Sequence, residues 1–331
     1  MEILIKQKNN SNNETSAKLE VLNYLENQVK EWMAVHVAKR KLWFSNDYLP
    51  ADEQFTDDQE SDLKKLRNRV RGIKDQVRVS VALNLLTEEG LPHFHRILAK
   101  HLGSDSFWSK WNNMWTGEED RHGCVLRDYA RDGRLFNFRE LELLQYRYQE
   151  TGFNPDWDMD PYKVFVYTTL QEKATQISHK NTGKLAGEEE PLLENILDHV
   201  AADEAKHYTF YRNVFKAILD LDPNRALLSA ANIMPSIEMP GYLMPGFRDI
   251  ADVVRRTGIY GPRDYKKIVE EVIKFWNIEI LSGLNEAALK AQEKIMSIPK
   301  RLEKVAEYIE QRTGKKTFSF DFIYNRILVF E

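Results

Sequence analysis

The sequence predicts an all-α protein built around a four-helix bundle, and three observations support this class. Glycine and proline are scarce, at 15 and 11 of 331 residues, so few positions break a helix. Apolar residues recur at spacings of three and four over long stretches, which is typical of amphipathic helices. A Glu-x-x-His pair occurs twice, and another glutamate precedes each pair at nearly the same distance. We therefore expect one helical domain over residues 18–331, preceded by a disordered polar tail over residues 1–17.

The expected helices follow one another closely in the first half of the chain. An apolar stripe begins at Leu19 and continues through Trp32 toward Trp43. After a loop come a charged helix, a long buried helix, a helix closed by glycine and a shorter one, over residues 58–74, 77–102, 104–132 and 138–150. Gly90 and Pro92 lie inside the long buried helix and predict a kink or a short break there.

The second half is expected to begin with two long helices, over residues 162–186 and 192–219. A connector with several prolines and glycines follows, and four further helices fit residues 248–257, 262–278, 280–297 and 299–314. Pro299 is expected to begin the last of these, because proline favours the first turn of a helix. In the tail, Phe318, Phe320 and Phe322 alternate with other residues, which predicts a small C-terminal β-hairpin.

The two Glu-x-x-His pairs carry the strongest chemical signal. They end at His122 and His207, and Glu88 and Glu172 lie 31 and 32 residues before the glutamates of the pairs. Residues at i and i+3 share a helix face, so a carboxylate and an imidazole can reach one ion together. Two metal ions between four helices require one Glu from each of two helices and a Glu-x-x-His pair from each of the others. The pattern predicts such a dinuclear site, held by Glu88, Glu119, His122, Glu172, Glu204 and His207.

The spacing leaves one choice and one alternative. Glu118 and Asp203 lie four residues before their histidines and share the same face, but the residue three before is glutamate in both copies, so we choose Glu119 and Glu204. The alternative is that these are solvated helix faces with i, i+4 charge pairs. Four carboxylates with two imidazoles suit iron or manganese better than zinc.

Composition excludes several other classes. No apolar run approaches the ~20 residues that a spanning helix needs, and the N-terminal stretch lacks the apolar segment of a secretory signal. A net charge of −4 disfavours a general nucleic-acid binder. Cys124 is the one cysteine, so no internal disulfide forms, and we expect a buried thiol and a cytoplasmic location.

Several longer strings surround the candidate ligands and continue beyond them. They are Thr87-Glu-Glu-Gly-Leu-Pro92, Trp115-Thr-Gly-Glu-Glu-Asp-Arg-His-Gly123, Gln171-Glu-Lys-Ala-Thr175, Ile177-Ser-His-Lys-Asn-Thr182, Ala201-Ala-Asp-Glu-Ala-Lys-His207, Met239-Pro-Gly-Tyr-Leu-Met244 and Phe318-Ser-Phe320. In these strings, from about Trp43 to the C-terminus, the chain resembles the soluble acyl-acyl-carrier-protein desaturases, the stearoyl-type enzymes of plants and their bacterial relatives. The departures are Asp120, where the family often has Asn, and Ala205-Lys206-His207-Tyr208, where it is often Lys-Arg-His-Glu.

The resemblance implies a ferritin-like bundle with flanking helices, and it places two iron ions on the six residues above, which decides for Glu88 over the neighbouring Glu89. It also implies three further roles. Thr175 would stand beside the oxygen-binding side of the metals, and Trp43 would belong to an electron route that Asp203 links to His122. The implied reaction uses oxygen to introduce a cis double bond into a saturated acyl chain carried on acyl carrier protein. A ferredoxin-like protein would supply the electrons, and the enzyme would form a homodimer.

Three other classes of protein share this kind of four-helix metal site, and a non-enzymatic function is a fourth alternative. An iron-storage protein would be shorter, and a ribonucleotide reductase small subunit needs a radical tyrosine and a C-terminal docking tail. A di-iron oxygenase or hydroxylase acting on an acyl or other small-molecule substrate stays open as the alternative, and a non-enzymatic helical protein is disfavoured by the intact ligand set.

Because acyl carrier protein is acidic, a basic docking surface is expected, with Lys64, Arg67 and Arg71 as candidates.

Overall fold

The computed structural model describes residues 2–49, 57–102, 105–157, 159–237, 239 and 241–331, apart from the side chains of helical residues 2–13 and 57–60. Within these ranges the fold is all-α with one two-stranded hairpin, which confirms the predicted class. The predicted disordered tail and the single-domain boundary stay predictions. Among the described residues, no helix is both long enough and apolar enough to cross a membrane.

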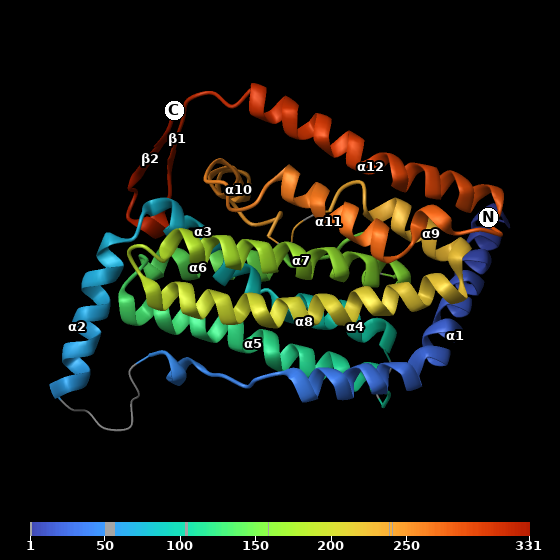
Figure 1. The fold of residues 1–331 in the computed structure, drawn as a ribbon, viewed down its shortest axis with the longest axis horizontal. Coiled ribbons are helices and arrows are strands. Elements are labelled where there is room, and N and C mark those ends of the chain that lie inside the picture. Colours follow the sequence, from blue (N-terminus) through green and yellow to red (C-terminus); the bar gives the residue numbers. More distant parts are fainter. Residues whose placement is uncertain (1, 50–56, 103–104, 158, 238, 240) are drawn as a thin grey trace.

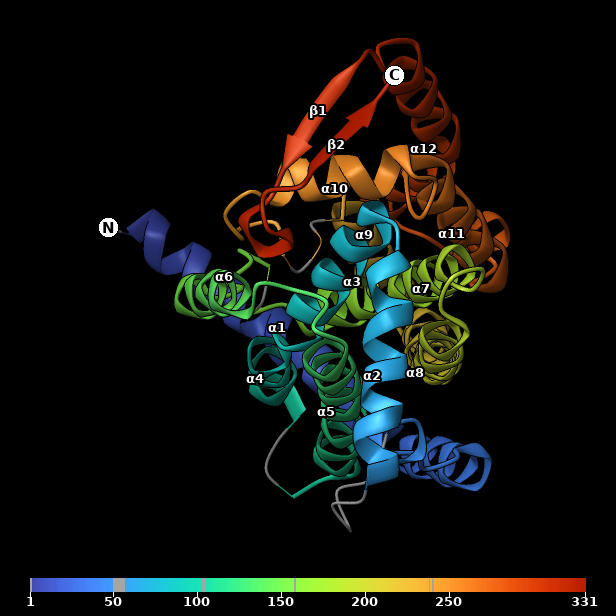
Figure 2. The ribbon, with the colours of Figure 1, turned by 90° about the vertical axis from the view of Figure 1, so that its left-hand side faces the viewer.

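Four helices form the central bundle: α3 (Asp75–Glu88), α5 (Phe107–Gly133), α7 (Pro161–Ala186) and α8 (Pro191–Leu221). They run side by side along the long axis of the molecule, and the end-on view shows them as a four-cornered group (Figures 1 and 2). Local sequence sets where α7 and α8 begin. Asp160 accepts hydrogen bonds from the first backbone amides of α7, and proline occupies the first turn of both helices.

The break that Gly90 and Pro92 predict inside the helix of residues 77–102 is present, and it separates α3 from α4 (Leu91–Leu102). α3 ends at Glu88, and the amide of Gly90 bonds to the carbonyl of Thr87 in a tight turn. Gly90 packs against the ring of Tyr148, so closely that a Cβ there would lie 2.6 Å from the Tyr148 hydroxyl. The turn therefore places Glu88 at the very end of a bundle helix.

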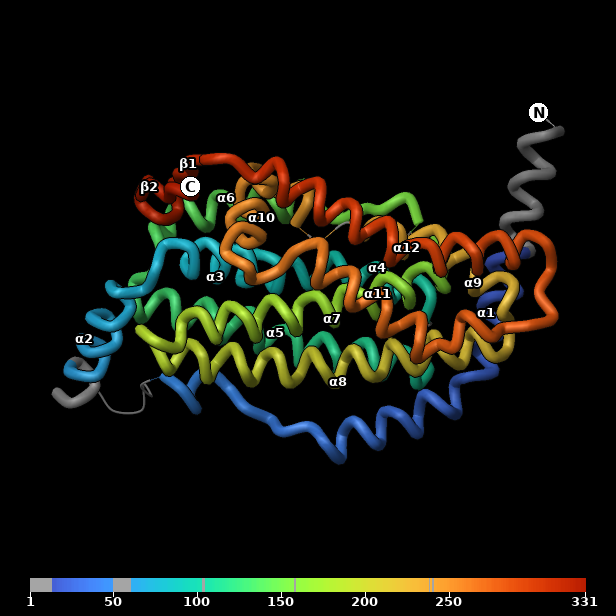
Figure 3. Tube along the Cα trace, turned by 45° about the horizontal axis from the view of Figure 1, so that its top comes forward, coloured from blue at the N-terminus to red at the C-terminus, as the bar shows by residue number. Residues whose placement is uncertain are grey.

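Further helices cover the bundle on two sides. α1 (Glu2–Lys39) lies along α5 and α8, while α9 (Pro223–Ile233), α11 (Pro262–Phe275) and α12 (Glu286–Gln311) cover the opposite side (Figures 1 and 3). Three further helices complete the outer layer: α2 (Asp57–Gly72), α6 (Phe138–Thr151) and α10 (Phe247–Arg256). Short 3-10 turns span Ser45–Asp47, Ile278–Ile280 and Asp321–Ile323.

The prediction for the region before the tail was wrong in one respect. Residues 280–297 and 299–314 do not form two helices, because Pro299 lies inside the continuous helix α12. Proline removes one backbone hydrogen bond there, but Ile295, Ile298 and Leu302 bury the apolar face on both sides of it. Burial of that face keeps the helix continuous. The hairpin prediction is confirmed: β1 (Lys316–Ser319) pairs antiparallel with β2 (Ile327–Phe330).

The apolar core consists of two clusters with a polar layer between them. On α5, Trp115 belongs to the first cluster and Leu126 to the second. On α8, the order along the helix is reversed, with Val200 in the second cluster and Tyr211 in the first. The buried acids and histidines of both helices fall between these positions, so the bundle encloses them on both sides.

Candidate metal centre

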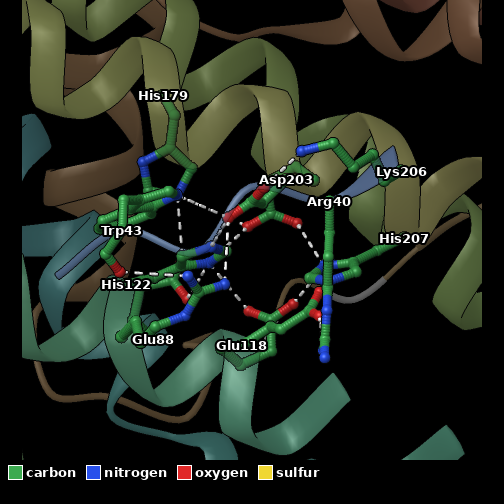
Figure 4. A network of polar contacts seen from close by, with 12 residues as sticks. Arg40, Trp43, Glu88, Glu118, His122, His179, Asp203, Lys206 and His207 are labelled. Atoms are coloured by element: carbon green, nitrogen blue, oxygen red, sulfur yellow. Dashed lines mark hydrogen bonds and ion pairs between the residues drawn. The ribbon is translucent and has the colours of Figure 1, made fainter. Parts of the chain in front are cut away.

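All six residues that the spacing selects meet inside the bundle. All six residues are buried, and none exposes more than 7% of its surface. The outer glutamates come from the two helices that carry no Glu-x-x-His pair, and each remaining helix supplies a glutamate and a histidine one turn apart. The members are Glu88 on α3, Glu119 and His122 on α5, Glu172 on α7, and Glu204 and His207 on α8 (Figure 4 shows part of this cluster).

The side chains form two overlapping sets of four. In each set the candidate ligand atoms lie within 4.8 Å of one another, and Glu119 and Glu204 belong to both. In the first set, His122 Nδ1 lies 3.2 Å from Glu119 Oε2 and 3.5 Å from Glu204 Oε1. Two carboxylates shared between two sets are what two neighbouring ions bridged by glutamates require. The sets are Glu88, Glu119, His122 and Glu204, and Glu119, Glu172, Glu204 and His207.

Many of the buried polar atoms of these sets have no hydrogen-bond partner. Both oxygens of Glu172, one oxygen of each shared glutamate, and Nδ1 of both histidines have none. His207 Nδ1 lies 2.7 Å from Glu119 Oε1, yet neither atom makes a hydrogen bond of acceptable geometry. Because buried polar atoms are almost always satisfied, so many orphaned lone pairs facing one another fit a site for cations. The residues present therefore fit a pair of metal ions.

A third group of possible ligands behaves differently. The side chains of His36, Glu118 and His207 also approach one another, but they are hydrogen-bonded: Glu118 Oε2 lies 2.9 Å from Nε2 of both histidines. Arg40 donates to the other oxygen of Glu118 at 2.9 Å. We therefore interpret this group as a support for His207. Because its Nε2–H donates to Glu118, the imidazole presents Nδ1 to the centre.

Glu118 and Asp203, the two residues that the spacing left as a choice, lie on the outer sides of the two histidines, although only Glu118 is within hydrogen-bond distance of its imidazole. Asp203 Oδ2 lies 3.7 Å from His122 Nε2, on the far side of that ring from the centre. Asp203 also accepts hydrogen bonds from Lys206, at 2.6 Å, and from Arg121, at 3.3 Å. The acid at i−4 on each helix thus faces the outer nitrogen of the histidine on the other helix, and the acid at i−3 faces the centre.

Trp43, expected on an electron route, packs directly on this group. Its indole N–H donates to Asp203 Oδ2 at 2.9 Å, and its ring is stacked on His122 with 5.9 Å between centroids. The side chain is buried, although Leu42 and Phe44 on either side are exposed. The structure thus brings Trp43, Asp203 and His122 into one contiguous group; the electron-transfer role is a proposal.

Sequence reasoning missed three residues of the centre. His179 is not among the predicted site residues, but its Nε2 lies 2.8 Å from Glu88 Oε1. A signal was present, since His179 follows Glu172 by seven residues and therefore shares its face of α7. His36 lies in α1 and Arg40 directly follows that helix; both are far away in sequence, and no local pattern marks them. Cys124 was expected to be buried and is exposed instead.

The charges of the metal-free cluster shift one another's pKa strongly. Burial, and then repulsion by Glu119 and Glu204, raises the pKa of Glu172. Burial alone lowers the pKa of His207, but the carboxylates of Glu119 and Glu118 outweigh it and raise the pKa to about 10. The pKa of His122 is raised for the same reason, mainly by Glu119. Without metal, protons on these side chains therefore balance the negative charge that metal ions would balance when bound.

Thr175, one turn after Glu172 on α7, lines a pocket of about 80 Å³. Its hydroxyl donates to the backbone carbonyls of Gln171 and Glu172, one turn earlier on α7. Thr87, next to Glu88, lines the same pocket. Most of the other lining residues are apolar, so this pocket is a candidate path from the surface toward the centre; they are Leu83, Asn84, Ala174, Ser178, Met239, Phe247, Ala251, Val254 and Tyr260.

Comparison with known proteins agrees with the fold and the site. A family model described as fatty acid desaturase matches residues 17–324. Stearoyl-acyl-carrier-protein 9-desaturase from Spinacia oleracea is 32% identical over 328 residues, covering 93% of this chain and 81% of the plant chain. Palmitoyl-acyl-carrier-protein 4-desaturase 3 from Ophrys sphegodes is also 32% identical, over 93% of this chain and 82% of its own.

Among solved structures, DesA2 from Mycobacterium tuberculosis H37Rv has a similar fold, with a TM-score of 0.58 over 82% of this chain and 99% of DesA2, at 20% identity. A helical bundle that gathers two Glu-x-x-His pairs and two further glutamates thus coincides with a family match over nearly the whole chain. The protein belongs to the fatty acid desaturase family.

Proposed function

We propose that this protein is an acyl-acyl-carrier-protein desaturase, which removes two hydrogen atoms from a saturated acyl chain to form a cis double bond. One observation carries the proposal: two four-residue sets share Glu119 and Glu204 in a buried layer between four helices. The relatives that are named for stearoyl and palmitoyl carrier-protein substrates support the substrate class.

The donor set favours iron as the metal. Four carboxylates and two imidazoles, with no thiolate, suit iron or manganese. Bound there, a pair of iron ions would supply, with dioxygen, the oxidising power to break an unactivated C–H bond, which no side chain supplies. Glu88 with His122, and Glu172 with His207, would each complete one ion's ligands, with Glu119 and Glu204 shared.

The chain itself would hold and orient the ligands. Glu118 accepts the Nε2 proton of His207, and Asp203 faces Nε2 of His122, so both imidazoles are turned with Nδ1 to the centre. The aromatic layer around Trp111, Trp115 and Tyr211 is buried and keeps water from that side of the cluster. A dry surrounding protects a strongly oxidising site from side reactions.

The acyl chain would enter along the apolar pocket beside Thr175 and Thr87. Its lining includes Thr87, next to Glu88, and Thr175, one turn after Glu172, so a chain lying in it would come near the outer glutamate of each set. Thr175 would stand at the oxygen-binding side. Trp43 and Asp203 would pass electrons to His122 from a ferredoxin-like donor, and the enzyme would act as a homodimer.

The proposal is tested with iron-loaded protein, reduced ferredoxin, oxygen and a saturated acyl carrier protein, with the product analysed by mass spectrometry. Loss of two hydrogen atoms supports desaturation, whereas gain of one oxygen atom establishes the alternative, a hydroxylase. An unchanged acyl chain, in protein that binds iron, overturns the proposal. The variant Glu204→Gln serves as the control, since it removes a shared ligand and should abolish either reaction.

A further inference from the structure

A chain of hydrogen bonds connects the carboxylate of Glu88 to the wall of the apolar pocket. His179 lies between α3 and α7, with Nε2 2.8 Å from Glu88 Oε1 and Nδ1 3.3 Å from the amide nitrogen of Asn84 (Figure 4 shows the first contact). The amide oxygen of Asn84 lies 2.9 Å from the hydroxyl of Ser178. His179 and Asn84 are only 1% and 4% exposed, so water does not compete for these groups.

Each proton in this chain is fixed by the next acceptor. An ionised Glu88 can only accept, so Nε2 of His179 carries the hydrogen. A neutral imidazole has one N–H, which leaves Nδ1 as an acceptor for the amide N–H of Asn84. The amide oxygen of Asn84 then accepts from the hydroxyl of Ser178. Asn84 and Ser178 therefore select the tautomer of His179 that can donate to Glu88.

This contact makes the two outer glutamates unequal. The hydrogen bond from His179 occupies Oε1 of Glu88 and leaves Oε2 facing the centre, 3.7 Å from His122 Nδ1. Both oxygens of Glu172, in contrast, have no hydrogen-bond partner. Glu88 would therefore offer a metal one oxygen that is free of a hydrogen bond, whereas Glu172 would offer two.

We propose that Ser178, Asn84 and His179 form a positioning relay, through which residues lining the apolar pocket hold the Glu88 carboxylate in place. The inference rests on the proposed function for the role of Glu88 as a ligand. Asn84 and Ser178 line the pocket together with Thr87 and Thr175. A change in the pocket wall, without touching a ligand, should therefore change metal binding.

Titration of the metal-free protein with Co²⁺, followed by visible absorption, tests the relay without turnover. His179→Leu removes the donor to Glu88 and should weaken one of two bound equivalents about 10- to 100-fold. His179→Gln keeps an amide N–H near the position of Nε2 and should restore affinity to within a few-fold of the wild type. Asn84→Leu and Ser178→Ala should give smaller losses at the same equivalent.

Thr182→Val is the matched control. Thr182 lies one turn beyond Ser178 and joins α7 to α3 by a 2.7 Å hydrogen bond to Ser80, so its loss disturbs the same helix pair without touching Glu88. This variant should bind both equivalents as the wild type does. Wild-type affinity in His179→Leu, or equal losses in His179→Leu, His179→Gln and Thr182→Val, overturns the relay.

Nitrogen NMR of the imidazole gives a second readout, which a general packing effect would not move. In the wild type, His179 should show a protonated Nε2 and an unprotonated Nδ1, and Asn84→Leu should produce a mixture of tautomers. An unchanged tautomer in Asn84→Leu contradicts the relay. If the Co²⁺ titrations contradict the relay, the proposed desaturase function is unaffected. If the His179 variants weaken one Co²⁺ equivalent but the wild type does not desaturate an acyl chain, only the proposed function is removed.

Discussion

At the scale of single residues, the histidines of the centre depend on carboxylates that do not face it. Glu118 and Asp203 lie one position before the shared glutamates, and they contact the outer nitrogens of His207 and His122. The sequence predicts which residues share a face, but a helix face is wide enough for two acids. Only the position of the facing helix decides which acid points inward.

Asp203→Asn should weaken metal binding about 10- to 100-fold, because the neutral amide holds His122 less firmly than the carboxylate. It should also slow reduction of the iron by the donor protein, since Trp43 loses a charged partner. Metal titration and stopped-flow absorption measure the two effects. Asp198→Asn, five residues earlier on α8 and paired with Lys180 at the surface, should change neither. Equal effects of the two variants contradict this role for Asp203.

Metal binding should become tighter as the pH rises through neutrality. The raised pKa values of His122 and His207 mean that both imidazoles carry an extra proton in the metal-free protein near pH 7, and a metal must displace these protons. Lower pH therefore weakens binding. We expect release of at least two protons per pair of ions, since Glu172 also has a raised pKa, measured by calorimetry in buffers of different ionisation enthalpy. A metal affinity that does not change with pH near neutrality contradicts the assignment of His122 and His207 as ligands.

At the scale of elements, the turn between α3 and α4 sets the position of Glu88. Gly90 and Pro92 predict a break in this helix, and the structure places it directly after Glu88. The sequence does not predict that Tyr148, from α6, closes over Gly90, because this contact depends on packing between distant segments. Pro299 shows the converse, since local helix-breaking chemistry is outweighed by burial along α12.

Gly90→Ala should destabilise the protein by about 1–3 kcal/mol, because the new methyl group meets the buried Tyr148 ring and the Thr87 carbonyl. Denaturant unfolding of the metal-free protein measures this change. Gly117→Ala is the control: it lies in α5 with open space around the added Cβ, and alanine there should be neutral or stabilising by about 0.5–1 kcal/mol. Similar changes for both variants would show that the Tyr148 contact is unimportant.

At the scale of the whole molecule, the basic helix α2 stands at one end of the bundle (Figure 1). The structure changes which of its cations suit a docking surface. Arg67 donates to the carbonyl of Asp132, and Arg69 pairs with the buried Glu190, so both help to fix α2 on the bundle. Lys64 and Arg71 are exposed and are the better candidates for contact with an acidic carrier protein.

Replacing Lys64 and Arg71 by glutamate should raise the KM for acyl carrier protein several-fold at low salt and leave kcat unchanged, because like charges oppose docking. Steady-state kinetics at two salt concentrations measure this. Lys304→Glu, on the exposed face of α12 across the bundle, should have no effect. An unchanged KM in the α2 variant removes this docking surface but not the proposed reaction.

The bundle, the order of its helices and the residues of the central layer could be predicted because each follows a local period. The contributions of His36 and Arg40 could not, since α1 reaches Glu118 only through tertiary packing. The same holds for the pocket beside Thr175, whose wall combines α3, α7 and α10 with the connector between α9 and α10.

Anomalous diffraction from crystals loaded with Fe²⁺ under anaerobic conditions tests the central claim most directly. We predict two iron peaks per chain inside the bundle, both adjoining Glu119 and Glu204, one beside His122 and the other beside His207. A single peak among His36, Glu118 and His207, or no peak within the bundle, would contradict the dinuclear centre on which the proposed chemistry depends.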